Sequence, residues 1–156
     1  MNIFVLGFLF SPSLEKVVLL RKNRPPWEKG YLNGISGHVE QDESPLHALN
    51  RESSKQIDYN GRWTYFGRIE NKILGGIIDC FYSVFPDEDV KVQSKTDEEA
   101  MIVITESIIE FGLEGRKPMG ISILENIPLL IAAAMTKIKH NRLEKKEKEW
   151  EFILKV

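Results

Sequence analysis

The side chains of this chain that are best suited to chemistry fall on one predicted helix. Ser44-Pro45 is typical of a helix start, because serine caps free N–H groups and proline suits the first helical position. We therefore expect a helix from about Pro45 to Gln56. Glu52, Lys55 and Gln56 are three and four residues apart, so they share one face of that helix. This face presents an acid, an ammonium group and a carboxamide together.

These three side chains suit different parts of phosphate chemistry. Carboxylate oxygens are ligands that Mg²⁺ prefers, which makes Glu52 a candidate catalytic residue and metal ligand. Gln56 offers a carbonyl oxygen, which coordinates magnesium without adding negative charge. Lys55 cannot coordinate a metal while charged, since at about 4 Å and an effective dielectric of about 20 a +1/+2 pair costs about 8 kcal/mol before relaxation. An ammonium group can instead bind phosphate directly; the alternative is an exposed lysine without a ligand.

The spacing around this helix resembles the Nudix box of the MutT-like hydrolases. Gly37, five residues, Glu43, seven residues and Arg51-Glu52 keep the order of the family pattern. Where that pattern continues with two adjacent glutamates, this chain has Lys55 and Gln56. We therefore interpret the segment as a degenerate Nudix box. The resemblance extends beyond the box, to residues 17–27, 33–34 and 96–99.

The resemblance implies a fold and an activity. The fold is α/β, a mixed β-sheet sandwiched between α-helices. The activity is hydrolysis of a nucleoside diphosphate linked to another group, with Mg²⁺ or Mn²⁺ as cofactor. In the metal-ligand set that the resemblance implies, Glu52 is the one acid that remains. The resemblance gives Glu43 and Arg51 a scaffold role, because a charge-assisted carboxylate–guanidinium pair can fix the loop against the helix.

Other side chains are candidates for a rewired site. Glu40 precedes the helix, and Glu98 and Glu99 match a region where family members often place a further metal ligand or base; the alternative is a solvated acidic turn. Gly37 and His38 are candidates for contact with phosphate. Four aromatic residues are candidates for stacking on a base, with a place in the core as the alternative: Trp27, Tyr31, Phe81 and Tyr82.

The whole-chain properties predict one domain spanning residues 1–156. The chain has 42% hydrophobic and 28% charged residues and a formal net charge of −2, which favours neither nucleic-acid nor membrane binding. Residues 3–10 are apolar but lack the preceding positive region of a signal peptide. The single cysteine, Cys80, can form no internal disulfide, which is typical of a reducing compartment. We expect a cytoplasmic protein.

Strand and helix signals give the expected order of elements. A hairpin is predicted at the start of the chain, followed by an irregular loop over 22–36. Ser122 to Glu125 has capping-box spacing and predicts a long helix that ends near His140, with Pro128 too deep for a free first-turn position. Strands are predicted over residues 2–10, 16–21, 61–70, 76–85 and 100–105, with a short helix after the last of them.

The C-terminal region is rich in charge. Lysine and arginine interleave with glutamate over 137–148, which is typical of a solvated helix face and argues against a nucleic-acid contact. Residues 150–156 are apolar enough to dock on the body or on a second copy of the chain, which leaves a homodimer open.

Three hypotheses for function follow. The leading hypothesis is recognition of a nucleotide-type, diphosphate-linked small molecule, with metal-dependent pyrophosphohydrolysis weak or lost. Mg²⁺ or Mn²⁺ is the expected cofactor if activity remains, and otherwise the protein has none. The alternative is an active hydrolase with a relocated Mg²⁺ or Mn²⁺ site built from Glu40, Glu52 and Glu98 or Glu99. The second alternative is a protein-interaction scaffold.

Overall fold

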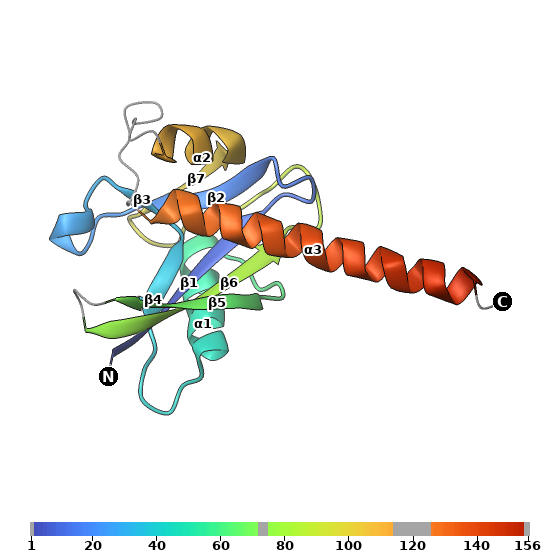
Figure 1. Ribbon diagram of the computed structural model, residues 1–156. Coiled ribbons are helices and arrows are strands. Elements are labelled where there is room, and N and C mark those ends of the chain that lie inside the picture. Colours follow the sequence, from blue (N-terminus) through green and yellow to red (C-terminus); the bar gives the residue numbers. More distant parts are fainter. Residues whose placement is uncertain (1, 72–74, 114–125, 155–156) are drawn as a thin grey trace.

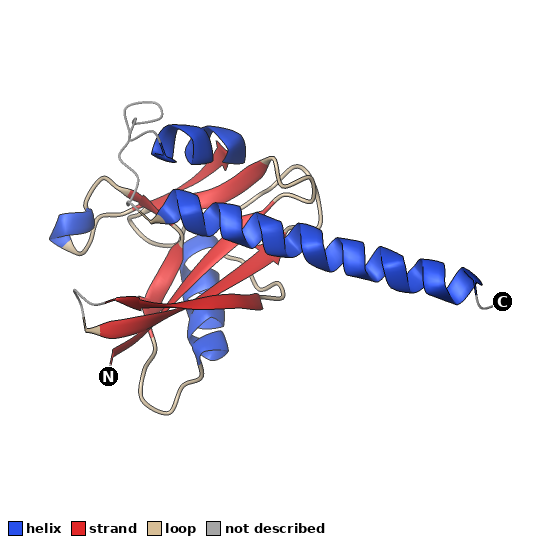
Figure 2. Ribbon diagram, viewed as in Figure 1, coloured by secondary structure: helices blue, strands red, loops and turns tan. Residues whose placement is uncertain are grey.

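The protein is built on a mixed β-sheet with helices on both faces (Figures 1 and 2). The computed structural model describes residues 2–71, 75–113 and 126–154. Within those ranges the strands are β1 (Asn2–Phe10), β2 (Lys16–Arg21), β3 (Leu32–Asn33), β4 (Ile35–His38), β5 (Thr64–Asn71), β6 (Gly76–Val84) and β7 (Glu99–Ile104). The helices are the 3₁₀ turn η1 (Pro26–Glu28), α1 (Pro45–Ile57), α2 (Thr105–Leu113) and α3 (Ile127–Leu154).

Strand β1 is the centre of the sheet. It pairs in parallel with β6 along its whole length, from Asn2 opposite Gly76 to Phe10 opposite Val84. On its other edge β1 pairs with two antiparallel strands. Residues 4–7 pair with β4, and Leu9 and Phe10 pair with β2. β7 and β3 pair with β2, and β5 pairs with β6. The β1–β2 pairing confirms the predicted hairpin.

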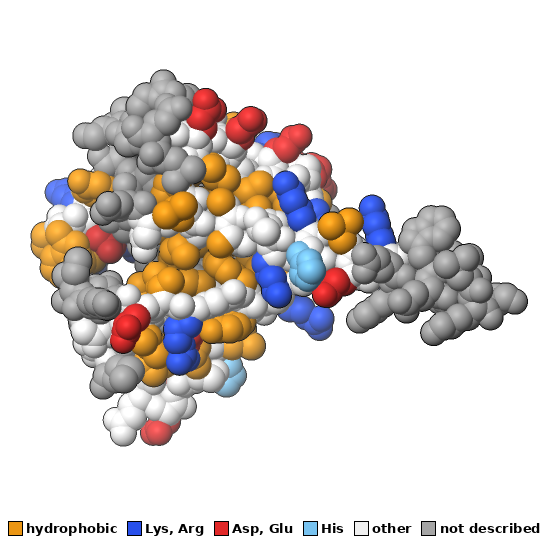
Figure 3. Space-filling view, in the orientation of Figure 1, with side chains coloured by type: hydrophobic (Ala, Val, Ile, Leu, Met, Phe, Trp, Pro, Cys, Tyr) orange, Lys and Arg blue, Asp and Glu red, His pale blue; other side chains and the backbone are white. Residues whose placement is uncertain are grey.

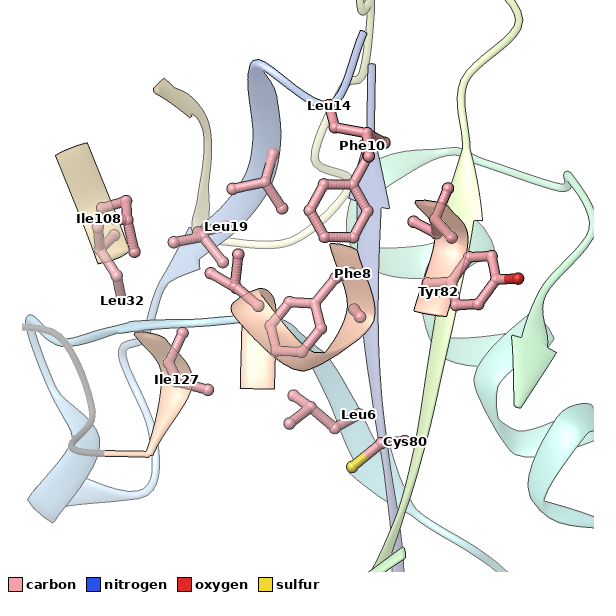
Figure 4. Close-up of a cluster of buried hydrophobic side chains, with 14 residues drawn as sticks. Leu6, Phe8, Phe10, Leu14, Leu19, Leu32, Cys80, Tyr82, Ile108 and Ile127 are labelled. Carbon is pink, nitrogen blue, oxygen red and sulfur yellow. The ribbon is translucent and has the colours of Figure 1, made fainter. Parts of the chain in front are cut away.

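Two hydrophobic clusters fill the space on either side of β1. Leu6, Phe8 and Phe10 alternate with residues of the opposite face and lie beneath α3 and α2 (Figure 4). Val5 and Leu9 point to the other face, against α1. Gly7 lies on this second face, where an added Cβ would come within 2.9 Å of Cδ1 of Leu49 on α1 and of a ring carbon of Trp63. The absent side chain therefore lets α1 approach the sheet closely.

Helix α1 forms where the sequence predicts it. The Ser44 hydroxyl accepts a hydrogen bond from the His47 N–H at 3.1 Å and caps the helix. The helix ends at Ile57, one residue beyond the predicted end, and Asp58 takes a left-handed conformation with a φ of 51°.

The loop predicted over 22–36 was wrong in part. It contains η1, β3 and the start of β4. Strand β4 contains a glycine and β3 has two residues, so neither carries the run of β-branched side chains that identifies a strand. Pairing with β1 and β2 forms both strands.

The end predicted for the last helix was also wrong. α3 continues past His140 to Leu154, and His140 Nε2 lies 3.0 Å from a carboxylate oxygen of Glu144, one turn further along the helix. Pro128 is the second residue of α3 and fits its first turn. The predicted capping box at 122–125 lies outside the described residues.

Helix α3 first covers the sheet and then projects from the body (Figure 1). Its covering part contributes Ile127, Ile131 and Ile138 to the core. The space-filling view shows hydrophobic side chains gathered on the face of the molecule that α3 crosses (Figure 3). Within the described ranges, none of the helices combines the length and apolar character needed to span a membrane.

Candidate functional site

Arg51 connects α1 to the loop that precedes it. Its Nε and one terminal nitrogen donate to the two carboxylate oxygens of Glu43, at 2.9 and 3.0 Å. The same nitrogen donates to the His38 carbonyl at 3.0 Å, at the end of β4. The hydrogen bonds from Arg51 lower the pKa of Glu43 to about 2. These contacts form the loop–helix clamp that the sequence predicts for Glu43 and Arg51.

Gly37 makes room for Glu52. An added Cβ at Gly37 would lie 2.5 Å from Cγ, 2.7 Å from Cδ and 2.9 Å from Oε1 of Glu52. These separations are far below ordinary contact, so the Glu52 side chain fills the space that any other residue at position 37 would use. Glu52 is buried in this position, with 8% of its surface exposed.

Both carboxylate oxygens of Glu52 already have donors. A terminal nitrogen of Arg51 donates to Oε1, and the amide Nε2 of Gln56 donates to Oε2. Each Glu52 oxygen therefore accepts a hydrogen bond, one from a positive guanidinium and one from an amide N–H. This arrangement neutralises the acid through neighbours on its own helix.

Gln56 is fixed by its amide nitrogen. Nε2 also donates to the Ser36 carbonyl at 2.8 Å. Exchanging the amide oxygen and nitrogen would direct an acceptor at two acceptors, so the hydrogen bonds determine the orientation. Among the described residues Oε1 has no hydrogen-bond partner, although it is buried. Gln56 therefore keeps an unused acceptor beside Glu52.

The side chains on this face do not form a group of acids that suits a magnesium ion. Lys55 is exposed in the last turn of α1, so an ammonium group, and not an acid, lies three residues after Glu52. Glu52 is engaged by Arg51, and Gln56 supplies no charge. In the described part of the chain, no three His, Cys, Asp or Glu side chains group together in a way that could hold a metal ion.

The acids proposed for a relocated metal site lie in different surroundings. Glu98 is buried in an ion pair with Lys22, with Nζ to Oε1 at 2.8 Å. Glu99 is exposed and lies 3.9 Å from Arg21, and Glu40 is exposed beside the clamp. The structure does not bring these acids together with Glu52 as one cluster.

The aromatic candidates separate into two groups. Trp27 and Tyr31 are exposed, with 66% and 37% of their surfaces accessible. Phe81 and Tyr82 are buried on opposite faces of β6 and belong to the two core clusters, so they are core residues, which the sequence had left as the alternative. His38 is exposed, with its ring edge-on to Phe4 at 5.3 Å between centroids.

Sequence reasoning missed the Lys22–Glu98 pair. Lys22 is 6% and Glu98 8% exposed, which is rare for charged residues. Lys22 follows an apolar strand and Glu98 lies in an acidic run, and both positions usually face solvent. Because their partners are far apart in sequence, the local pattern carried no signal of burial.

Comparison with known proteins identifies the fold. No family model and no curated protein matches the sequence. Among solved structures, the Nudix domain of NrtR from Shewanella oneidensis, complexed with ADP ribose, is 14% identical, with a TM-score of 0.68 over 87% of each chain. A structure from work on MutT of Aliivibrio salmonicida and Vibrio cholerae is 15% identical, with a TM-score of 0.62 over 86% of this chain and 96% of that one. The ORF135 protein of E. coli is 19% identical, with a TM-score of 0.62 over 87% of this chain and 89% of that one.

These likenesses span most of both chains and agree with the mixed sheet and its helices. The chain therefore has the Nudix fold.

Proposed function

We propose that this protein binds a nucleotide-type diphosphate ligand at the loop–helix frame of α1, with metal-dependent hydrolysis weak or absent. One observation carries the proposal: the remaining acid of the helix, Glu52, is held by Arg51 and Gln56, while Lys55 is exposed on the same helix. A frame that retains its shape but replaces acids by a cation and an amide suits an anion better than a metal ion.

The geometry of the frame supports retained binding. The clamp of Arg51 on Glu43 and on the His38 carbonyl holds the loop in place. Lys55 supplies a positive charge for phosphate oxygens as a point charge, without the water activation that a metal ion provides. The ligand class is supported by the structural neighbour NrtR, whose Nudix domain is complexed with ADP ribose.

The chemistry of the helix supports weak or absent turnover. Hydrolysis of a diphosphate by this fold family relies on metal ions to neutralise charge and to generate the attacking water. A cation at Lys55 repels such ions, and both oxygens of the buried Glu52 carboxylate already accept hydrogen bonds, from Arg51 and from Gln56.

The test is calorimetric titration of ADP into the protein in EDTA, for the unmodified chain and for Lys55→Gln. We expect Lys55→Gln to weaken binding about 10- to 100-fold, the equivalent of losing one charge-assisted hydrogen bond. The matched control is Lys139→Gln, which removes an exposed lysine from α3 and is expected to change nothing. Equal affinity in the unmodified chain and Lys55→Gln would reject Lys55 as the phosphate contact.

A second variant restores the acids of the family pattern. Lys55→Glu with Gln56→Glu is expected to gain Mg²⁺ binding and to lose ADP binding in EDTA, because two negative charges replace a cation and an amide. If this variant gains no magnesium affinity, the surrounding pocket has diverged from the family's metal site.

A further inference from the structure

The segment between β2 and β3 presents an aromatic side chain at the edge of the molecule. Trp27 lies in η1, and 66% of its surface is exposed, which is high for a large hydrophobic residue. Figure 3 shows hydrophobic atoms at the outer end of this segment, which Figure 1 places away from the helical layers. We call residues 22–31 the Trp27 loop.

The base of the Trp27 loop is closed by the backbone of Lys22. The Lys22 N–H donates to the Tyr31 carbonyl at 2.8 Å, and the Gly30 N–H donates to the Lys22 carbonyl at 2.7 Å. Gly30 has a φ of 85°, a left-handed conformation that glycine adopts without strain. One residue therefore holds both ends of the loop together.

The side chain of Lys22 anchors this closure to a second segment. Its Nζ donates to Oε1 of Glu98 at 2.8 Å, and Oε2 of Glu98 accepts the Asn23 N–H at 2.6 Å. Asp97 adds two contacts, since its carbonyl accepts from the Asn23 amide at 2.8 Å and its carboxylate pairs with Arg24 at 3.0 Å. The loop is thus braced on one side along three consecutive residues.

Burying an ion pair carries a desolvation cost. Removing two charges from water offsets much of their attraction, so an apolar pair of similar size often stabilises a fold as well or better. Directional hydrogen bonds, by contrast, fix orientation. The Lys22–Glu98 pair fixes the base of the loop, while the Trp27 ring stays exposed to solvent. A loop that is held in place before binding loses less entropy when its exposed ring contacts a ligand.

We infer that Trp27 is the stacking contact for the aromatic base of the bound ligand, and that Lys22 and Glu98 are its positioning residues. This inference rests on the proposed function and narrows it to diphosphates that carry an aromatic base. Tyr31, at the end of the loop, is joined through β3 and β4 to Gly37, which lies beside Glu52. In this arrangement the loop contacts the base of the ligand, and the α1 frame contacts its diphosphate.

The test separates the base from the diphosphate. ADP and inorganic pyrophosphate are titrated by calorimetry into the unmodified protein, Trp27→Leu and Trp27→Phe. Stacking on an aromatic side chain accounts for about 5- to 100-fold in affinity. We expect Trp27→Leu to lose that factor for ADP, Trp27→Phe to retain most of it, and pyrophosphate to bind all three alike. The matched control is Tyr65→Leu, an exposed aromatic on β5 with 51% of its surface accessible, which is expected to change neither affinity.

The positioning residues are tested with the pair Lys22→Met and Glu98→Met made together. This double variant removes both charges and leaves no buried charge unpaired, so we expect the fold to survive. We expect its ADP affinity to fall toward that of Trp27→Leu, with pyrophosphate affinity unchanged. A general loss of folding would lower both affinities instead.

The outcomes distinguish this inference from the proposed function. ADP binding that Trp27→Leu leaves unchanged would overturn the inference while the proposed function stands. An unmodified protein that binds pyrophosphate as tightly as ADP would do the same. If neither compound binds, the proposed function is wrong and the inference falls with it.

Discussion

Replacing Gly37 by alanine tests the geometry of the site at its tightest point. The new Cβ would lie 2.5 Å from Cγ of Glu52, so one of the two side chains must move by about 1 Å to reach ordinary contact. Overfilling a buried position costs about 1–3 kcal/mol. Displacing the Glu52 carboxylate also weakens its bonds to Arg51 and Gln56, and a hydrogen bond to a charged group is worth about 1.5–3 kcal/mol.

These two costs are partly offset because alanine has less conformational freedom than glycine in the unfolded chain. This effect favours the folded state by about 0.4–1 kcal/mol. We therefore expect Gly37→Ala to lower the free energy of unfolding by about 2–4 kcal/mol, measured by urea denaturation. The matched control is Gly67→Ala in β5, where an added Cβ meets nothing within 4 Å; we expect a change below about 1 kcal/mol.

A double-mutant cycle identifies the cause. Glu52→Ala removes the atoms that the new Cβ would meet, so Gly37→Ala should cost about 1–2 kcal/mol less in the Glu52→Ala background. If Gly37→Ala costs less than about 0.5 kcal/mol, or costs the same in both backgrounds, Glu52 does not occupy the space beside Gly37 and our description of the site is wrong.

Three further predictions concern pH, reactivity and burial. The pKa of Glu43 is lowered from its ordinary 4.5 to about 2. The stabilisation by ionised Glu43 is therefore present above pH 4.5 and is lost as the pH falls toward 2. Denaturation across a pH series should show a smaller loss of stability in that window for Glu43→Gln than for the unmodified protein. Burial raises the pKa of the Cys80 thiol to about 12, so Cys80 should react slowly with a thiol reagent at pH 8 until urea unfolds the protein, and fast reaction of the native protein would show that the thiol is accessible. Lys22→Met should lower the free energy of unfolding by about 3–5 kcal/mol, because it leaves Glu98 buried without Lys22. The control Lys91→Met removes a lysine from an exposed pair with Asp89 and should lower it by less than about 1 kcal/mol. Similar losses in both variants would contradict the burial of Lys22.

The parts of the fold that were predictable have short-range causes. α1 was found because Ser44-Pro45 marks its start, and the β1–β2 hairpin was found because two β-rich runs flank a turn. β3 and β4 were missed because pairing with β1 and β2, and not local propensity, forms them. The extension of α3 was missed because its charged part has no apolar stripe to indicate a helix packed on the body.

Part of the candidate site was also predictable from the sequence. The Glu43–Arg51 pair was expected from the resemblance to the Nudix box, and the structure shows the two side chains in contact. The hydrogen bonds of Glu52 to Arg51 and Gln56 depend on rotamers and backbone positions that the spacing does not determine. The burial of Glu98 with Lys22 depends on a contact 76 residues apart in sequence.

The measurement that tests the central claim most directly is a calorimetric titration of ADP into the unmodified protein in EDTA, followed by addition of excess Mg²⁺ and product analysis of the same sample. Our account predicts saturable binding without metal and no release of AMP after magnesium is added. Binding that requires Mg²⁺, with AMP release that Glu52→Gln abolishes, would contradict it and show a working hydrolase. Absence of binding in both conditions would also contradict it and favour an interaction scaffold.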